Sequence, residues 1–412
     1  MKLKTFASLS LITLAALLLP AAHAQTYTVL HNFTGGVDGG YPYAGVTIKD
    51  GTLYGTTAYG GSSFGIDGNG TVYQVKSLGS KWSTTPVLIF QTAGGQAPFA
   101  RVVFGPDGQL YGTTANGGNS IYSGVVFSLT PPPRTLAAAI YWPWSETLVH
   151  QFQDFPDGAQ PIGGDLTWDQ QGNIYGTTSR GGQNLLGTVY ELTPSDNGYT
   201  ANVLYSFQDS SESLIRSGVI VDHNGNLFGT AVGGFFSDHG KVYELSYTPG
   251  VGWVKTDIYN FQNGTDGGGP AGGLVMDNAG NLYGATWIGG SGNGGTIFEL
   301  SPTGNTWTFK LLYSLSGPSG ENCGPHQSLT IDAAGNLYGT TYCDGATSYG
   351  SVFKLANTAN GWVYTTLHDF AVNDDGGANP NSQVTIDTDG TLYGTTSIGG
   401  PGRYGGVWMI KP

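Results

Sequence analysis

Short apolar segments recur along the chain, separated by polar turns. Each repeat has four of them, as in residues 274–277, the phrase at 282–286, and the segments at 294–300 and 309–315. They are rich in β-branched and aromatic residues and bounded by Gly, Asn, Asp or Pro, which is typical of strands. No helical period continues beyond residue 24. The pattern predicts an all-β fold.

The phrase Leu-Tyr-Gly-Thr-Thr, with small variations, marks the repeat. Successive copies are 57, 64, 53, 55, 55 and 55 residues apart. Their first residues are Leu53, Leu110, Ile174, Leu227, Leu282, Leu337 and Leu392. Seven units of four strands predict a seven-bladed β-propeller with four antiparallel strands per blade. A sandwich would not repeat its sequence, and a β-solenoid has shorter coils.

The two ends of the repeat are complementary. Residues 27–33 match the fourth segment of a unit, whereas residues 406–411 match the third. Pairing the N-terminal strand with the C-terminal strand would complete the last blade and remove two open sheet edges. The sequence therefore predicts a ring that is closed by its own ends.

Several residue types recur in register and are therefore interpreted as structural. An Asp carboxylate can cap backbone N–H groups in a tight turn, and the Gly that follows supplies a left-handed conformation. These turn residues are Asp169, Asp222, Asp277, Asp332 and Asp387. Aromatic residues also recur in register, eight residues before the end of strand four, and we expect them to pack: Trp82, Trp144, Tyr199, Trp253, Trp307 and Trp362.

The repeat resembles the GloVer (Gloeo/Verruco) tandem repeat of exported bacterial proteins. The resemblance is carried best by Asn-Leu-Tyr-Gly-Thr-Thr at 336–341 and by Gly-Gly-Thr-Ile-Phe-Glu-Leu at 294–300. It covers essentially residues 27–411, although the fourth unit departs from it with Phe-Gly-Thr-Ala at 228–231. The resemblance implies an exported repeat protein and supplies no catalytic motif.

The first 24 residues have the pattern of a signal peptide. Lys2 and Lys4 precede an apolar run, and Ala-His-Ala at 22–24 is a small-x-small cleavage site. We expect cleavage after Ala24, a single propeller domain over 25–412, and a secreted or periplasmic monomer. An uncleaved N-terminal anchor is the alternative.

The net charge narrows the range of partners. The whole chain has 15 Lys+Arg and 28 Asp+Glu, a formal net charge of −13. An acidic surface disfavours nucleic acid, and no apolar segment after the leader predicts membrane insertion.

The chain has two cysteines, Cys323 and Cys343. Both lie in loops at the same edge of the sixth unit, so a disulfide is predicted for an exported chain. Free buried thiols are the alternative.

The loops entering the first strand and those joining strands two and three are expected on one face, called here the top face. At the start of the first strand one position varies in every unit: Tyr43, Phe99, Ile162, Arg216, Ala271, His326 and Asn381. The next position is nearly always small, which suits strands that crowd toward an axis. Further in, Arg101 and Asp165 are interpreted as an ion pair between blades, or alternatively as lining of the channel mouth.

The top face is the predicted ligand-binding site. Trp287 and Tyr342 interrupt a series of small residues there, and such rings stack on sugars or aromatic ligands. Packing between blades is an equally weighted alternative for both rings. We predict binding of an extracellular glycan or protein by Trp287, Tyr342, His326, Arg216, Arg180 and Tyr43.

Catalytic and metal-binding motifs are weak. The alternative function is a polysaccharide hydrolase or lyase with acidic residues near the axis, yet no pair is singled out among the top-loop acids Asp157, Glu212, Asp238, Glu321 and Asp344. No cofactor is predicted, apart from Ca²⁺ in a top loop such as 373–376 as a minor expectation. The insertion at 131–144 is either a partner patch or a cover for a blade edge.

Overall fold

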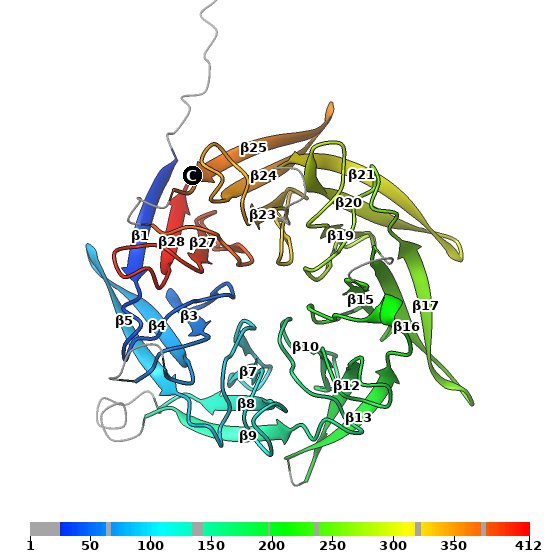
Figure 1. Cartoon of the computed structure of the whole chain (residues 1–412), viewed down its shortest axis with the longest axis horizontal. Coiled ribbons are helices and arrows are strands. Elements are labelled where there is room, and N and C mark those ends of the chain that lie inside the picture. Colours follow the sequence, from blue (N-terminus) through cyan, green and yellow to red (C-terminus); the bar gives the residue numbers. More distant parts are fainter. Residues whose placement is uncertain are drawn as a thin grey trace, which may run out of the picture.

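A computed structural model describes residues 25–62, 67–133, 143–196, 198–234, 239–317, 323–371 and 376–412. Seven four-stranded antiparallel sheets follow one another around a ring (Figure 1). The predicted seven-bladed β-propeller is therefore confirmed. The leader lies outside the described residues, and within them no helix is long and apolar enough to cross a bilayer.

The blades share one strand order, from the axis outward. The innermost strands are β2 (Thr47–Lys49), β6 (Val103–Phe104), β10 (Thr167–Trp168), β14 (Ile220–Val221), β18 (Val275–Met276), β22 (Thr330–Ile331) and β26 (Thr385–Ile386). The second strands are β3 (Thr52–Thr57), β7 (Leu110–Thr114), β11 (Ile174–Thr178), β15 (Leu227–Ala231), β19 (Leu282–Ala285), β23 (Leu337–Thr341) and β27 (Leu392–Thr396). The third strands are β4 (Thr71–Leu78), β8 (Val125–Thr130), β12 (Thr188–Ser195), β16 (Lys241–Thr248), β20 (Asn293–Thr303), β24 (Ser351–Thr358) and β28 (Gly406–Lys411). The outer strands are β5 (Lys81–Ile89), β9 (Ser145–Gln151), β13 (Gly198–Ser206), β17 (Gly252–Asn260), β21 (Thr306–Ser316), β25 (Gly361–Asp369) and β1 (Thr26–Asn32), and a 3₁₀ turn, η1, spans Ser210–Glu212.

The N-terminal strand closes the ring. β1 pairs antiparallel with β28, from Thr26 opposite Lys411 to Asn32 opposite Gly406. Figure 1 shows β1 beside β28 in the last blade, close to the C-terminus. Leu30 and Phe33 contribute to a core cluster shared by the first and last blades. The predicted closure is confirmed, and it satisfies two edges that would otherwise be open.

Four of the five predicted Asp turns have the expected capping role, at Asp169, Asp222, Asp277 and Asp332. In the last blade Asp389, and not Asp387, accepts from the N–H group two residues on. Asp277 Oδ1 accepts hydrogen bonds from the N–H groups of Ala279 and Asn281, both at 2.9 Å. Its Oδ2 accepts from the Asn281 amide at 2.8 Å and from the Tyr283 hydroxyl at 3.0 Å. Gly280 has φ = +84°, the left-handed conformation that closes the turn. Because Tyr283 is the tyrosine of the repeated phrase, turn and phrase form one hydrogen-bonded unit.

The glycine of the phrase lies under an aromatic ring of the third strand. A Cβ atom on Gly339 would be 2.6 Å from the ring of Phe353, which is too close for any real contact. The same arrangement recurs in every blade, in the pairs Gly55–Tyr73, Gly112–Phe127, Gly176–Tyr190, Gly229–Tyr243, Gly284–Phe298, Gly339–Phe353 and Gly394–Trp408. Buried rings therefore require glycine at this position.

The first threonine of the phrase joins neighbouring blades. Thr340 Oγ1 donates to the Ser382 carbonyl of the next blade at 2.8 Å, and Thr395 Oγ1 donates to Ala44 at 2.9 Å across the closure. The fifth blade has Ala285 at this place and lacks the bond. The remaining bonds of this type are Thr56 to Ala100, Thr113 to Pro161, Thr177 to Ser217 and Thr230 to Gly272.

The apolar core lies between blades. Each of the seven larger clusters combines residues of two adjacent blades. The recurrent aromatic position packs against these clusters as predicted, through Trp82, Trp253, Trp144, Trp362, Tyr199 and Trp307. Most of the 131–144 insertion lies outside the described residues.

Candidate ligand-binding site

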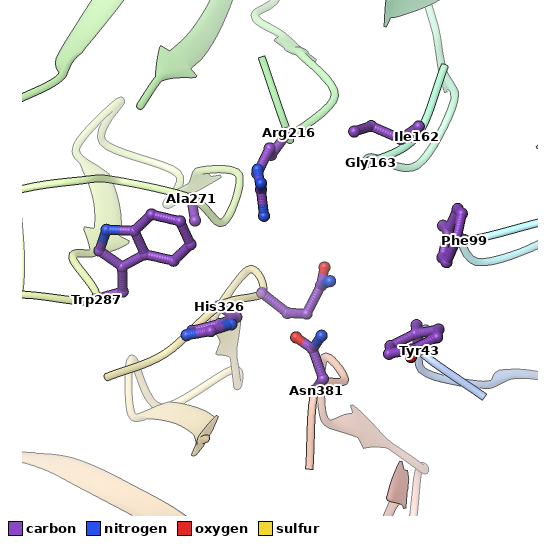
Figure 2. Close-up of a pocket in the computed structure, with 10 residues that line it drawn as sticks. Tyr43, Phe99, Ile162, Gly163, Arg216, Ala271, Trp287, His326 and Asn381 are labelled. Carbon is purple, nitrogen blue, oxygen red and sulfur yellow. The ribbon is translucent and has the colours of Figure 1, made fainter. Parts of the chain in front are cut away.

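The variable position before each innermost strand lines one pocket at the axis of the ring. This axial pocket has a volume of about 280 Å³ (Figure 2). It is lined by Tyr43, Phe99, Ile162, Arg216, Ala271, His326 and Asn381, one from each blade, together with Gly163, Trp287 and Gln327. The residues that differ most between units therefore converge at one place.

Small residues below this ring let the innermost strands approach one another. A Cβ atom on Gly163 would lie 1.9 Å from the Arg216 carbonyl oxygen, and one on Gly272 would lie 2.4 Å from that of Gln327. Adjacent blades are thus in backbone contact just beneath the pocket. This contact fixes the backbone positions of the lining residues and brings the blades close together at the axis.

One side of the axial pocket is aromatic. The rings of Tyr43 and Phe99 lie 5.4 Å apart between centroids, and Tyr43 is 6.5 Å from Tyr41. Tyr59 lies 6.3 Å from Phe99, and Tyr404 lies 5.7 Å from Tyr41. These five rings, Tyr41, Tyr43, Tyr59, Phe99 and Tyr404, form an aromatic platform that extends outward from the pocket. Burial raises the pKa of Tyr43, with smaller contributions from Tyr59, Tyr342 and Tyr41, so its hydroxyl is neutral.

The opposite side combines a cation with stacked rings. The Arg216 guanidinium carbon lies 5.4 Å from the Trp287 ring centroid. Trp287 is 5.0 Å from His326, and His326 stacks on Tyr342 at 4.7 Å with a 12° interplanar angle. Figure 2 shows Arg216 and Asn381 directed toward the centre of the pocket.

The two predicted rings on this side have different roles. Trp287 is only 8% exposed and packs with Val232 and Ala271, so it is mainly a packing residue with one edge in the pocket. Tyr342 is not among the residues that line the pocket, and its ring stacks on His326.

Arg216 is the one permanently charged residue among the ten described lining residues, and no carboxylate lines the pocket. Burial by the pocket walls lowers the pKa of Arg216. Arginine nevertheless remains protonated in proteins at neutral pH. A chain with a net charge of −13 therefore has a positive site at its axis.

The other charged candidates lie elsewhere. Arg180 is exposed and does not line the axial pocket, and its backbone pairs with Ala159. Arg101 and Asp165 form the predicted ion pair between blades, with Nε donating to Oδ2 at 3.0 Å. Both lie in a second axial hollow. The geometry thus unites Tyr43, Arg216, His326 and Trp287, but not Arg180.

The described top-loop acids are engaged in the fold. Asp157 pairs with His150 at 2.8 Å, and Glu212 pairs with Lys255 at 2.6 Å. Asp344 is 8% exposed and accepts a hydrogen bond from the Ser351 hydroxyl at 2.9 Å. Asp238, Glu321 and residues 373–375 lie outside the described residues. In the described ranges, no group of three or more His, Cys, Asp or Glu side chains is placed to hold a metal ion.

The predicted disulfide is formed and supports the pocket. Cys323 and Cys343 are bonded, with their Cα atoms 4.5 Å apart. The Tyr342 N–H donates to the Cys323 carbonyl at 3.0 Å, and the Gly324 N–H donates to the Trp287 carbonyl at 3.1 Å. These links hold the loop that carries His326 against the segment directly after β23, which carries Tyr342.

Sequence reasoning missed part of the platform. Tyr41, Tyr59 and Tyr404 come from three separate loops, and Tyr41 has φ = +58°. The sequence did carry a signal for Tyr59, because this aromatic residue is the second one after Gly-Thr-Thr in the first unit, next to Ala58.

Known structures share the fold. No curated protein sequence matches the chain. An ancestral GH74 enzyme is 12% identical with a TM-score of 0.56, over 90% of this chain and 47% of its own, so the chain spans about half of that enzyme. A candidate 6-phosphogluconolactonase of Bacteroides fragilis is 14% identical with a TM-score of 0.52, over 85% and 87% of the two chains. A Lactobacillus plantarum protein is 15% identical with a TM-score of 0.51, over 79% and 84%. At these identities the likeness shows the fold alone.

The sequence repeat identifies the family. The Gloeobacter/Verrucomicrobia repeat matches residues 18–146 and 216–412, which together form most of the chain. The segment between these regions contains a further blade with the same four strands, β10 to β13. The chain therefore belongs to the Gloeobacter/Verrucomicrobia repeat family.

Proposed function

We propose that the protein is an exported binding module that holds an extracellular carbohydrate in the axial pocket. The observation that carries the proposal is the convergence of one variable side chain from each blade on a single pocket. Ligand sites are concave, with apolar walls and a few polar groups that fix orientation, and the axial pocket has this composition.

The lining chemistry suits a sugar. A pyranose ring has an apolar C–H face and a hydroxyl edge. Tyr43 and Phe99 offer aromatic faces, whereas Asn381, Gln327 and Arg216 offer hydrogen-bonding groups. Export is part of the proposal because it would bring the site to extracellular glycans. The leader pattern and the disulfide support it, since disulfides persist in oxidising compartments.

Binding is favoured over hydrolysis. Glycosidases generally need two carboxyl groups roughly 5–10 Å apart at the scissile bond. The ten described lining residues contain none, and Asp165, an acid of the second axial hollow, is paired with Arg101. We therefore keep catalysis as the alternative that the experiment must exclude.

The experiment is a glycan array with a parallel assay of reducing-end release on the same polysaccharides. We expect retention of at least one glycan without release. The double variant Tyr43→Ala/Phe99→Ala should lose retention, because both aromatic faces are removed. Tyr122→Ala is the matched control, since Tyr122 is 65% exposed and does not line the pocket. Release of reducing ends, or equal retention by the double variant, would overturn the proposal.

A further inference from the structure

Unlike Arg101 and Lys255, Arg216 has no acidic partner among the described residues. Arg101 pairs with Asp165, and Lys255 pairs with Glu212. Within the described residues, no carboxylate lies within ion-pair distance of the Arg216 guanidinium. Its guanidinium instead lies over the ring of Trp287.

The position of this cation is fixed by the fold. Arg216 follows Ile215, which is 1% exposed, and precedes Ser217, which is 2% exposed, so its backbone is anchored on both sides. The Trp287 ring beside it belongs to a buried cluster. A cation–π contact with a fixed ring restricts a guanidinium while leaving its N–H groups available to a ligand.

The pocket presents charge and aromatic surface on opposite sides. Figure 2 places Arg216 across the pocket from Tyr43 and Phe99. A ligand that fills the space therefore meets a planar cation at one side and aromatic faces at the other. Asn381 and Gln327 provide amide groups in the same lining.

We propose that the axial pocket selects a carboxylate-bearing sugar, a uronate unit of an acidic polysaccharide, with Arg216 binding the carboxylate. This inference rests on the proposed function and specifies its ligand class. A uronate has a carboxylate at one edge of its ring and a C–H face, which match the two sides of the pocket. A guanidinium forms two parallel hydrogen bonds with a carboxylate, and this geometry adds specificity as well as affinity.

The aromatic platform extends the site beyond one sugar. From Tyr43 the rings continue outward through Tyr41 to Tyr404, and from Phe99 to Tyr59, which is 39% exposed. Sugar units next to the bound uronate therefore have aromatic faces on which to lie. We therefore expect a trimer to be the suitable probe, because it can reach both the axial pocket and the platform.

The test measures binding of defined trisaccharides to the full chain by calorimetry. The probes are oligogalacturonate, oligoglucuronate and oligomannuronate trimers, their methyl esters, maltotriose, cellotriose and a sulfated galactose trimer. The variants are Arg216→Gln and Arg216→Lys, with Arg180→Gln as matched control. Arg180→Gln removes the same charge from another exposed top-loop position outside the pocket. The melting temperature of each variant verifies folding.

We expect at least one uronate trimer to bind, and its methyl ester to bind about tenfold more weakly or worse, because the charged hydrogen bonds are lost. The Arg216→Gln variant should bind the uronate trimer about tenfold more weakly or worse, and its affinity for a neutral trimer should change little. Arg216→Lys should recover part of the loss, since it restores charge without the planar fork. Arg180→Gln should bind as the wild type does.

Three results would overturn the inference. One is equal binding of acid and ester, with no effect of Arg216→Gln. Another is preference for the sulfated trimer over every uronate. The third is an equal loss in Arg180→Gln, which would indicate the general charge of the face. If neutral trimers bind and Tyr43→Ala/Phe99→Ala abolishes that binding while Arg216 has no effect, the proposed function stands and the uronate inference fails. If no trimer binds, the uronate inference fails, and the glycan array alone decides the proposed function.

Discussion

The two ends of the innermost strands differ in how much their residues vary between blades. The lower end leads into an Asp turn that is chemically repeated, as in Asp277 and Asp332, where each carboxylate accepts four hydrogen bonds. The loop that enters the upper end carries one position that is Tyr, Phe, Ile, Arg, Ala, His or Asn in the seven blades. The same strand is thus constrained at one end and free to vary at the other.

Differences in bonding explain this contrast. The lower turn, the glycine under its ring and the inter-blade threonine each satisfy buried polar groups or fill buried space, so a change there destabilises the fold. The axial side chains project into a pocket, and the small residues beneath them set the backbone. Within one chain, the repeated positions maintain the ring and the divergent positions are available for a ligand.

Among changes to the repeated positions, removal of the strand that closes the ring should destabilise the fold most. Deletion of residues 25–33 removes β1 and two buried core residues, Leu30 and Phe33. Loss of those side chains alone is worth about 5 kcal/mol or more, and the deletion also exposes the edge of β28. We expect a much lower melting temperature and self-association in light scattering.

A matched variant separates the effect of exposing the edge of β28 from the effect of removing core side chains. Leu30→Ala/Phe33→Ala keeps the backbone pairing of β1, so it should lower the melting temperature while remaining monomeric. A deletion variant that melts like the wild type as a monomer would contradict closure.

Adding a single methyl group at a repeated glycine should also destabilise the fold, by a smaller amount. Gly339→Ala places a Cβ atom 2.6 Å from the buried ring of Phe353, and such overpacking costs about 1–3 kcal/mol. The free energy of unfolding in urea measures the effect. Gly264→Ala is the control, because its Cβ atom would have only the Asp266 carboxylate nearby, at 3.7 Å. Equal stability of the two variants would refute the assigned role of the glycine.

The smallest effect concerns pH. At Asp277, burial alone would raise the pKa, but hydrogen bonds from Asn281, Tyr283 and Ala279 lower it overall. At Asp344, burial raises the pKa despite hydrogen bonds from Thr341 and Ser351. Asp277 therefore adds stability above the unfolded-state pKa of about 4, and this contribution is lost as the pH falls through its folded-state pKa. Asp344 acts in the opposite direction, because stability falls as the pH rises from about 4 through its folded-state pKa.

Melting temperatures of Asp277→Asn and Asp344→Asn across the acid range measure these signs. The deficit of Asp277→Asn relative to the wild type should shrink in acid. Asp344→Asn should gain on the wild type as the pH rises. Parallel pH curves for the two variants would show that the carboxylates do not differ as described.

The fold was predictable because its signal is repeated. Seven copies of one phrase, together with complementary ends, specified blade number, strand order and closure without any knowledge of individual contacts. The disulfide and the Arg101–Asp165 pair were also predicted, since both depend only on which loops and strands are neighbours.

Only the site residues that occupy an equivalent position in each repeat could be predicted from the sequence. Tyr43, Arg216 and His326 occupy one register position and therefore meet at the axis. Arg180 belongs to a loop whose side-chain direction the register does not determine. The platform residue Tyr41 depends on a left-handed backbone at a non-glycine residue, which no local pattern signals.

We assign ligand binding to the divergent axial residues and stability of the ring to the repeated residues. The most direct test measures glycan affinity and melting temperature together, on Tyr43→Ala/Phe99→Ala and on Asp332→Ala. We expect the axial variant to lose binding at a nearly unchanged melting temperature, whereas the turn variant should melt at a lower temperature and still bind. The reverse pattern, an axial variant that melts lower while binding persists, would contradict it.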